Sequence, residues 1–147
     1  MTMTRPIVAL ALGTALGATT PGSAPRSYVE ARTATSDRPF SDAVRVGDTL
    51  YLSGKIGVDA DGKVPADAAS EARNVLSDVQ KTLLGAGMTM DDLVFVQVFC
   101  SDVEHYRSFN EVYRTYFTKE LPARAFIGSG KLLFGARFEV QGIAAKR

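Results

Sequence analysis

The sequence contains few of the side chains that hold metals or form covalent intermediates. Its 147 residues include one cysteine, Cys100, and one histidine, His105. A single cysteine excludes an intramolecular disulfide and a zinc site made of several thiolates. A single histidine leaves at most one residue to activate a serine or cysteine nucleophile. Cys100 ends an apolar run and is predicted to be a buried, small hydrophobic residue, whereas His105 is predicted to lie on the surface.

The sequence also lacks an excess of charge of either sign. Lysine and arginine number 17, aspartate and glutamate number 16, and both signs are scattered along the chain. Proteins that bind nucleic acids or anionic membranes concentrate positive charge. We therefore expect no nucleic-acid partner and no membrane partner. The content of 46% hydrophobic and 22% charged residues is typical of one packed globular domain.

The first 24 residues have the pattern of a signal peptide. Arg5 precedes a short apolar stretch, residues 6–18, and small residues follow it. The stretch is too short to span a bilayer. We expect residues 1–24 to be the signal peptide of a periplasmic or secreted protein, residues 25–37 an extension, and residues 38–147 the domain. The alternative is an over-extended start codon and a cytoplasmic protein. Loss of Arg5 would leave 16 basic and 16 acidic residues, and no net charge.

Hydrophobic periodicity predicts three strands, a helix, a strand, a second helix and two final strands. A hairpin turn at Gly47-Asp48 and a helix stop at Gly87 have the clearest signals, because both conformations favour glycine. The capping-box spacing of Ser101 and Glu104 predicts the start of the second helix. The predicted segments are strands at 27–33, within 43–53, at 93–100, 123–128 and 137–144, and helices at 68–86 and 103–117. This order favours an α+β fold, with one mixed sheet and both helices on one face.

Side-chain alternation predicts which faces of the strands are buried. In the hairpin, one face is expected to carry Val44, Val46, Leu50 and Leu52. Strand 93–100 is apolar at nearly every position, which indicates a central strand that is buried on both faces. One of its faces is expected to carry Val94, Val96, Val98 and Cys100, and the other Leu93, Phe95, Gln97 and Phe99. Helices cover only one of these faces, so we expect self-association to bury the other.

Three segments, taken in order, resemble one known family. Residues 38–57 end in Leu-Ser-Gly-Lys-Ile-Gly, and residues 109–117 begin with Phe-Asn-Glu-Val-Tyr. Pro-Ala-Arg at 122–124 is then followed by Phe-Glu-Val-Gln-Gly-Ile-Ala at 138–144. Their conjunction resembles the Rid (YjgF-type) family of enamine/imine deaminases, also labelled L-PSP endoribonucleases. The resemblance implies a chorismate-mutase-like fold of the bacillus type, assembled into a homotrimer with clefts between the subunits.

The resemblance assigns the chemistry to Arg124 and Glu139. The arginine of the family's Pro-Ala-Arg motif binds the substrate carboxylate, and a planar guanidinium suits that task because it donates two parallel hydrogen bonds. The acidic residue on the last strand resembles the group that orients or deprotonates the attacking water. Apart from the resemblance, Arg124 could face solvent. Glu139 could belong to a polar stripe with Arg137 and Gln141, or to an internal ion pair.

Five further positions match the family's cleft, two of them with a different residue. Asn110 and Ser53 match polar cleft positions, and Gly54 follows Ser53 in the same substrate-binding motif, although Asn110 could instead hold a loop and Ser53 could end a strand. Phe40 stands where well-known members have a tyrosine, so a phenolic donor is lacking. Phe126 stands where they have a cysteine, and its larger ring is expected to narrow or reshape the pocket.

These matches imply hydrolysis of a reactive 2-enamino or 2-imino acid to the 2-keto acid and ammonia, with no metal or organic cofactor. Arg124 would hold the carboxylate while a water assisted by Glu139 attacks the imine carbon. The alternative is a non-catalytic trimeric protein that binds small carboxylates, which Phe40, Phe126 and the export signal favour. The neutral charge and the lack of paired histidines disfavour a ribonuclease.

Overall fold

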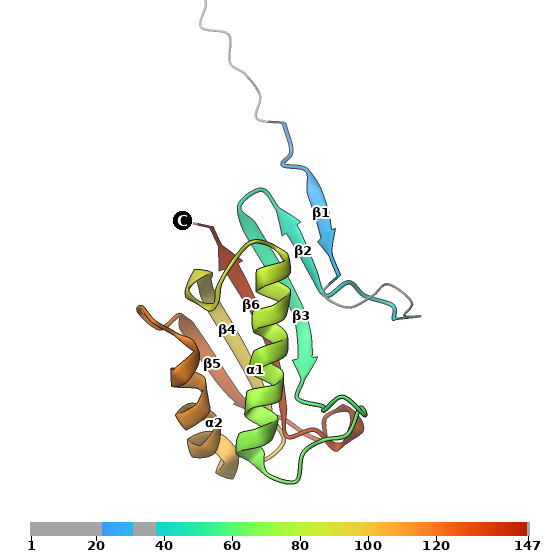
Figure 1. The fold of residues 1–147 in the computed structure, drawn as a ribbon, viewed down its shortest axis with the longest axis vertical. Helices are drawn as coiled ribbons and strands as arrows, with labels where there is room; N and C mark the ends of the chain where they lie inside the picture. The colour runs from blue at the N-terminus through green and yellow to red at the C-terminus, as the bar shows by residue number, and fades with distance from the viewer. Residues whose placement is uncertain (1–21, 31–37, 147) are drawn as a thin grey trace, which may run out of the picture.

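The fold contains the predicted order of elements. The structure is a computed structural model that describes residues 22–30 and 38–146. The predicted signal peptide falls mainly on residues 1–21, and part of the predicted extension on residues 31–37, all outside the described residues. In chain order the main elements are β1 (Arg26–Val29), β2 (Ala43–Val46), β3 (Thr49–Ile56), α1 (Ala68–Gly85), β4 (Leu93–Cys100), α2 (Tyr106–Tyr113), β5 (Ala123–Gly128) and β6 (Phe138–Ala145) (Figure 1).

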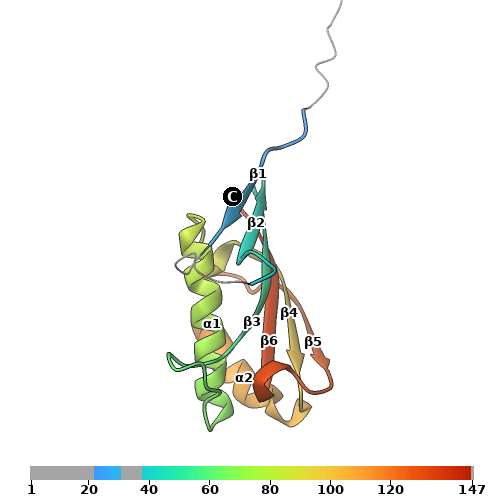
Figure 2. The same cartoon turned by 90° about the vertical axis from the view of Figure 1, so that its right-hand side faces the viewer.

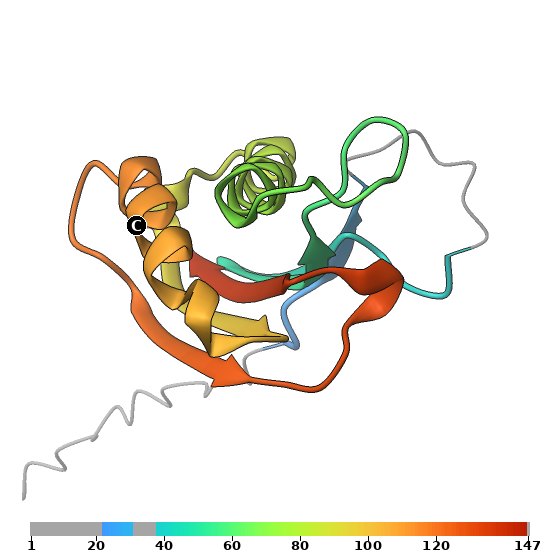
Figure 3. The ribbon, with the colours of Figure 1, turned by 90° about the horizontal axis from the view of Figure 1, so that it is seen from below.

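The six strands form one mixed sheet in the order β1-β2-β3-β6-β4-β5. β4 and β5 pair in parallel, and the other neighbours pair antiparallel. Both helices lie against the same face of this sheet (Figures 2 and 3), which confirms the predicted α+β architecture. No described element covers the opposite face, which is called the open face below. Among the described residues, no helix is long and apolar enough to cross a membrane.

Helix α1 supplies much of the core and is held at both ends. The Asp67 carboxylate accepts a hydrogen bond from the backbone N–H of Ser70 at 2.8 Å, which caps the first turn and lowers the pKa of Asp67. Gly87 follows the helix with φ of +69°, as the glycine stop predicts. The Arg45 guanidinium donates a hydrogen bond to the carbonyl of Ala86 at 3.1 Å. This bond gives a partner to a carbonyl at the helix end, where no further turn supplies a backbone donor.

The β2–β3 hairpin is present, but the predicted faces are wrong. The two-residue turn at Gly47-Asp48 pairs Val44 with Tyr51 and Ala43 with Leu52. Paired residues point to the same face, so an even-numbered residue of β2 shares its face with an odd-numbered residue of β3. Ala43 and Leu52 therefore face the helices together with Leu50, whereas Val44 and Val46 face the other way. The prediction treated the two strands as one continuous alternation.

Strand β4 is central, but an irregularity changes its alternation. The pairing with β6 shifts between Leu93 and Phe95, which leaves Val94 49% exposed and turns Leu93 into the core at 6% exposure. Beyond the shift, Val96, Val98 and Cys100 share one face as predicted, and this face lies under the helices. Phe95, Gln97 and Phe99 occupy the open face and are only half-buried. There the Gln141 amide donates to the Gln97 side-chain oxygen at 2.8 Å.

The second helix begins later than the capping-box spacing predicts. Asp102 is the capping residue, and its carboxylate accepts from the backbone N–H of Glu104 at 3.0 Å. A single 3₁₀ turn, Val103–His105, leads into α2. Cys100 is fully buried, as predicted, and burial raises the pKa of its thiol. His105 is half-buried, because its ring lies edge-on to Phe138 at a centroid distance of 6.1 Å.

Candidate functional site

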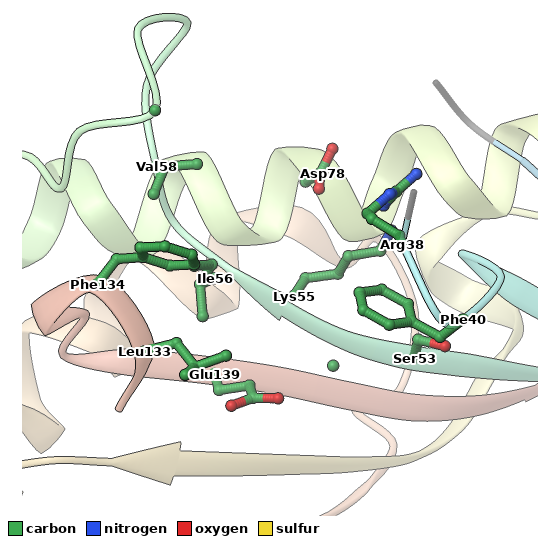
Figure 4. A pocket seen from close by; sticks show the side chains of 12 residues that line it. Arg38, Phe40, Ser53, Lys55, Ile56, Val58, Asp78, Leu133, Phe134 and Glu139 are labelled. Carbon is green, nitrogen blue, oxygen red and sulfur yellow. The ribbon is translucent and has the colours of Figure 1, made fainter. Parts of the chain in front are cut away.

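A pocket of about 630 Å³ lies beside β3, beyond the point where β2 stops pairing with it. Figure 4 shows the pocket from close by. Its lining contains four residues that the sequence predicts for the site: Phe40, Ser53, Gly54 and Glu139. The structure therefore brings these four together. The remaining lining residues are Arg38, Lys55, Ile56, Val58, Gly62, Asp78, Leu133 and Phe134.

The Glu139 carboxylate forms part of the pocket lining and lies against Gly54. The β3–β6 pairing is irregular between Leu52 and Lys55, so Ser53 and Gly54 form a bulge opposite Gln141, and the Glu139 side chain, two residues along β6, reaches Gly54. A Cβ on residue 54 would overlap the Glu139 carboxylate, so only glycine allows this approach. Within residues 22–30 and 38–146, no group donates a hydrogen bond to the Glu139 carboxylate or forms an ion pair with it. Its oxygens are therefore available to a water or a ligand.

Ser53 ties this bulge to the segment that carries Phe40. The Ser53 hydroxyl donates to the carbonyl of Ser41 at 2.6 Å, and the Ser53 backbone N–H donates to the carbonyl of Asp42 at 3.1 Å. These two bonds fix the position of Phe40, whose side chain is 49% exposed beside the pocket. Ser53 therefore lines the pocket and also holds one of its walls.

A buried charge cluster that the sequence reasoning missed supports the same wall. Asp42 is fully buried and Lys55 is 5% exposed, and the two form an ion pair. Arg38 donates to the Asp42 carboxylate at 3.0 Å, and this bond raises the pKa of Arg38. Buried charges require such partners. The spacing of the three residues in the sequence, across a loop and a strand, gave no signal of the cluster.

A short turn, Leu133–Gly135, forms the opposite wall and was also missed. Phe134 has φ of +57°, in the left-handed region, although it is not glycine. Such a conformation costs a bulky residue about 1 kcal/mol or more. Leu133 and Phe134 are 69% and 79% exposed, so little packing compensates for this cost. An exposed turn has no periodicity that sequence analysis could detect.

A second group of predicted residues surrounds Arg124 on strand β5. The Arg124 guanidinium donates to the Asn110 side-chain oxygen at 2.7 Å. The guanidinium carbon also lies 4.6 Å from the ring centroid of Tyr113, a distance typical of a cation–π contact. Phe126 packs edge-on against Tyr106 at 4.9 Å and stands beside the guanidinium. Helix α2 and strand β5 therefore fix the direction of Arg124 while leaving it partly exposed.

Tyr113, like Tyr106, belongs to this group although the sequence reasoning did not assign it to the site. It is 3% exposed, and its buried hydroxyl has no hydrogen-bond partner among the described residues. Burial raises the pKa of Tyr113 to about 12, although the positive charge of Arg124 acts to lower it. The ring is therefore neutral and presents its face to the guanidinium.

Arg124 and Glu139 lie on opposite faces of the sheet within one chain. Arg124 pairs with Val96, which is buried under the helices, so its side chain starts on the helix-covered face. Glu139 pairs with Phe99, which belongs to the open face. The structure therefore presents two half-sites, one around Arg124 and one around Glu139. Their register shows that no single chain brings the two predicted catalytic residues together.

The predicted polar stripe on β6 is only partly present. Glu139 and Gln141 share the open face, but Arg137 precedes the strand and turns toward α1. Its guanidinium donates to the carbonyl of Pro65 at 2.9 Å and to the Glu71 carboxylate at 2.7 Å. Glu71 is fully buried and also accepts from the backbone N–H groups of Arg137 and Phe138. This carboxylate fixes the strand start one residue before Glu139.

Neither half-site has the composition of a metal centre. Over the described ranges, no group of three or more histidine, cysteine, aspartate or glutamate side chains could hold a metal ion. The pocket instead combines a carboxylate, a hydroxyl and apolar walls. The second half-site presents a guanidinium, which suits a carboxylate ligand.

Comparison with known proteins places the chain in a family. The family model described as endoribonuclease L-PSP matches residues 31–146. A mouse protein named 2-iminobutanoate/2-iminopropanoate deaminase is 36% identical over 110 residues, which cover 74% of this chain and 82% of the relative. The chain therefore belongs to the Rid (YjgF-type) family, also known as the L-PSP family, as the sequence predicts.

Solved structures of relatives have the same fold. The yeast protein YEO7 has a TM-score of 0.77 at 30% identity, over 84% of this chain and all of that one. Escherichia coli TdcF with bound serine has a TM-score of 0.76 at 27% identity, over 82% of this chain and 99% of that one. The chain thus contains the whole fold of these relatives.

Proposed function

We propose that the protein is a hydrolytic deaminase of reactive 2-enamino and 2-imino acids. An enamine tautomerises to the imine, water adds to the imine carbon, and the carbon–nitrogen bond breaks to give a 2-keto acid and ammonia. One water is consumed for each ammonia released, so no redox partner is required. The observation that carries the proposal is the half-buried Arg124 guanidinium, fixed by Asn110 and Tyr113, in a relative of named imine deaminases.

Arg124 binds the substrate carboxylate in this mechanism. Asn110 occupies only part of the donor capacity of the guanidinium, so further N–H groups are available for a bidentate contact. The serine bound by the relative TdcF also carries a carboxylate. A fixed cation beside the reaction centre orients the imine carbon for attack.

Glu139 accepts a proton from the attacking water and returns it to the departing nitrogen. Its carboxylate is a suitable base because it stands in an apolar pocket with no competing donor among the described residues. The absence of a Cβ at Gly54 leaves room for the carboxylate at this position. A water bound there would lie between the carboxylate and the substrate.

Because the two half-sites lie on opposite faces of one sheet, we propose that they meet between subunits of a homotrimer. Arg124 of one subunit would complete the pocket around Glu139 of the next. The open face with its half-buried Phe95 and Phe99 supports the same assembly, because an apolar sheet face requires a cover. The small carboxylate substrate would then bind at three equivalent sites.

A non-catalytic role in binding small carboxylates is the second candidate. The apolar Phe40 in the pocket favours it, because this residue has no phenolic donor for catalysis. The predicted export signal also favours it, since the usual enamine-forming dehydratases are cytoplasmic. A binding protein would be stabilised by a 2-keto acid without any turnover of the imine.

Release of the keto acid from 2-aminoacrylate generated in situ tests the proposed reaction. We expect Arg124→Ala to lower kcat/KM by about a hundredfold or more, because a charge-assisted contact to the carboxylate is lost. Arg107→Ala is the matched control, since Arg107 is exposed and forms an ion pair with Glu111 outside both half-sites. Equal rates of keto-acid release from the wild type and Arg124→Ala would contradict the proposal.

A further inference from the structure

The turn Leu133–Gly135 has a backbone and an exposure that folding alone does not explain. Phe134 adopts the left-handed conformation that glycine or asparagine adopts more easily, and Gly135 follows with φ of +74°. The Phe134 side chain is 79% exposed and takes no part in the buried core. A strained residue that exposes a large apolar ring beside a pocket indicates a binding role.

The position of this turn shows what it would contact. In Figure 4, Leu133 and Phe134 stand on one side of Glu139, and Phe40 stands on the other. Ile56 of β3 lies between them. A ligand whose reacting carbon is near Glu139 therefore extends toward apolar walls on both sides.

The polar groups in these walls already have partners. The Ser53 hydroxyl donates to the Ser41 carbonyl, and the Lys55 ammonium pairs with Asp42. Polar partners for a ligand thus concentrate at Glu139, whereas the surface around it offers aromatic and aliphatic contacts. Such a pocket matches a ligand with one polar, reactive end and an apolar body.

We infer that Leu133 and Phe134 bind the substrate side chain, so that the protein prefers 2-imino acids with an aromatic or branched aliphatic side chain. This inference rests on the proposed deaminase function and specifies its substrate class. The imines of alanine and 2-aminobutyrate, like those in the name of the mouse relative, carry only a methyl or an ethyl group to contact the apolar walls. Larger side chains gain the contacts of Phe134 and Phe40 in the bound state.

The test compares imines produced in situ by a flavin-dependent amino-acid oxidase from phenylalanine, leucine and alanine. Semicarbazide traps the unreacted imine, so hydrolysis appears as a loss of the semicarbazone absorbance. We expect kcat/KM for the phenylalanine and leucine imines to exceed that for the alanine imine by about tenfold or more. Phe134→Ala and Phe134→Gly should each lower, by about tenfold, the ratio of kcat/KM for the phenylalanine imine to kcat/KM for the alanine imine.

Two controls separate substrate binding from folding and assembly. Phe134→Gly suits the left-handed backbone, so the turn is retained without the ring. Leu84→Ala removes another exposed apolar side chain, 58% exposed on α1 and outside the pocket, and should leave the preference unchanged. If either Phe134 variant changes the molecular mass in solution, the turn packs against another subunit, and the inference is wrong.

Binding of stable products distinguishes the inference from the function on which it rests. Turnover of all the imines with no preference, or with a preference that Phe134→Ala leaves intact, would overturn the inference and retain the deaminase function. Without any turnover, tighter calorimetric binding of phenylpyruvate than of pyruvate, lost in Phe134→Ala, would support the assigned ligand class and reject the function. Equal binding of both keto acids without turnover would overturn both proposals.

Discussion

The carboxylate of Glu139 occupies the space next to Gly54 where any other residue would place its Cβ. The bulge in β3 creates this approach, because two residues of that strand stand opposite one position of β6. Ser53-Gly54 is therefore a geometric requirement of the Glu139 half-site. The glycine sets where the carboxylate stands relative to the pocket.

Gly54→Ala should therefore displace the Glu139 carboxylate. We expect keto-acid release to fall by at least about tenfold, whereas the free energy of unfolding should change little, because the overlapping atoms belong to the end of a flexible side chain that can move. Enzyme assays and denaturant titration measure the two effects. Gly130→Ala is the control, because a Cβ there meets nothing within 4 Å. Wild-type activity in Gly54→Ala would show that the position of Glu139 is unimportant.

Mixing two inactive variants tests whether the half-sites meet between subunits. Arg124→Ala retains Glu139, and Glu139→Gln retains Arg124, so a site between one subunit of each kind can be intact. In random mixed trimers about a quarter of the sites combine both native residues. We expect co-expression to restore about that fraction of the wild-type keto-acid release. No recovery in confirmed mixed oligomers would place both residues of each site in one chain.

Asn110 is expected to position Arg124. Asn110→Ala removes the acceptor that holds the guanidinium at 2.7 Å, so KM for the imine should rise about tenfold with a smaller change in kcat. Asn110→Asp should be more harmful, because its carboxylate competes with the substrate for the same cation. Glu111→Ala, a neighbouring exposed position, serves as the control. Steady-state kinetics that show an unchanged KM in both Asn110 variants would contradict this role.

Tyr113 should make stability fall in alkaline solution. Burial raises the pKa of Tyr113 from its usual 10.0 to about 12, so the folded state retains a proton that the unfolded state releases. The stability that depends on this proton is fully present below pH 10 and is lost as the pH rises to 12. The free energy of unfolding therefore decreases by roughly 2 kcal/mol over this range. Tyr113→Phe should reduce that decrease and should not destabilise the protein at pH 7, because the buried hydroxyl has no partner among the described residues. Denaturant titrations of the wild type and Tyr113→Phe at pH 7, 10 and 11 measure this difference. An identical decrease of the free energy of unfolding with pH in both proteins would contradict the prediction.

Local patterns in the sequence predict the elements but not all of their faces. Helix α1 follows directly from apolar spacing and the glycine at position 87, since both are local signals. The faces of the hairpin depend on the length of its turn, and those of β4 on the shift between Leu93 and Phe95. Side-chain alternation cannot show either effect, because one inserted or missing residue moves every later side chain to the opposite face of the sheet.

The candidate site was likewise predictable only in part from local patterns. Motif resemblance led to Ser53, Gly54 and Glu139, which one pocket unites, and to Asn110 and Arg124, which one hydrogen bond unites. The separation of the two groups depends on strand register across the sheet, which no single motif contains. Leu133 and Phe134 were missed because their contribution depends on exposure and on a single φ angle.

The Glu71 carboxylate has a mechanical consequence for the site. It receives the backbone N–H groups of Arg137 and Phe138 and the Arg137 guanidinium, so the first turn of α1 and the beginning of β6 are bound to one buried group. Strand ends ordinarily fray, and their amides exchange quickly with solvent deuterium. Here the amides of Arg137 and Phe138 should exchange as slowly as those of the core. Glu139, the next residue, is thereby attached to a stiff part of the molecule, and its position is insensitive to motion in the neighbouring loop.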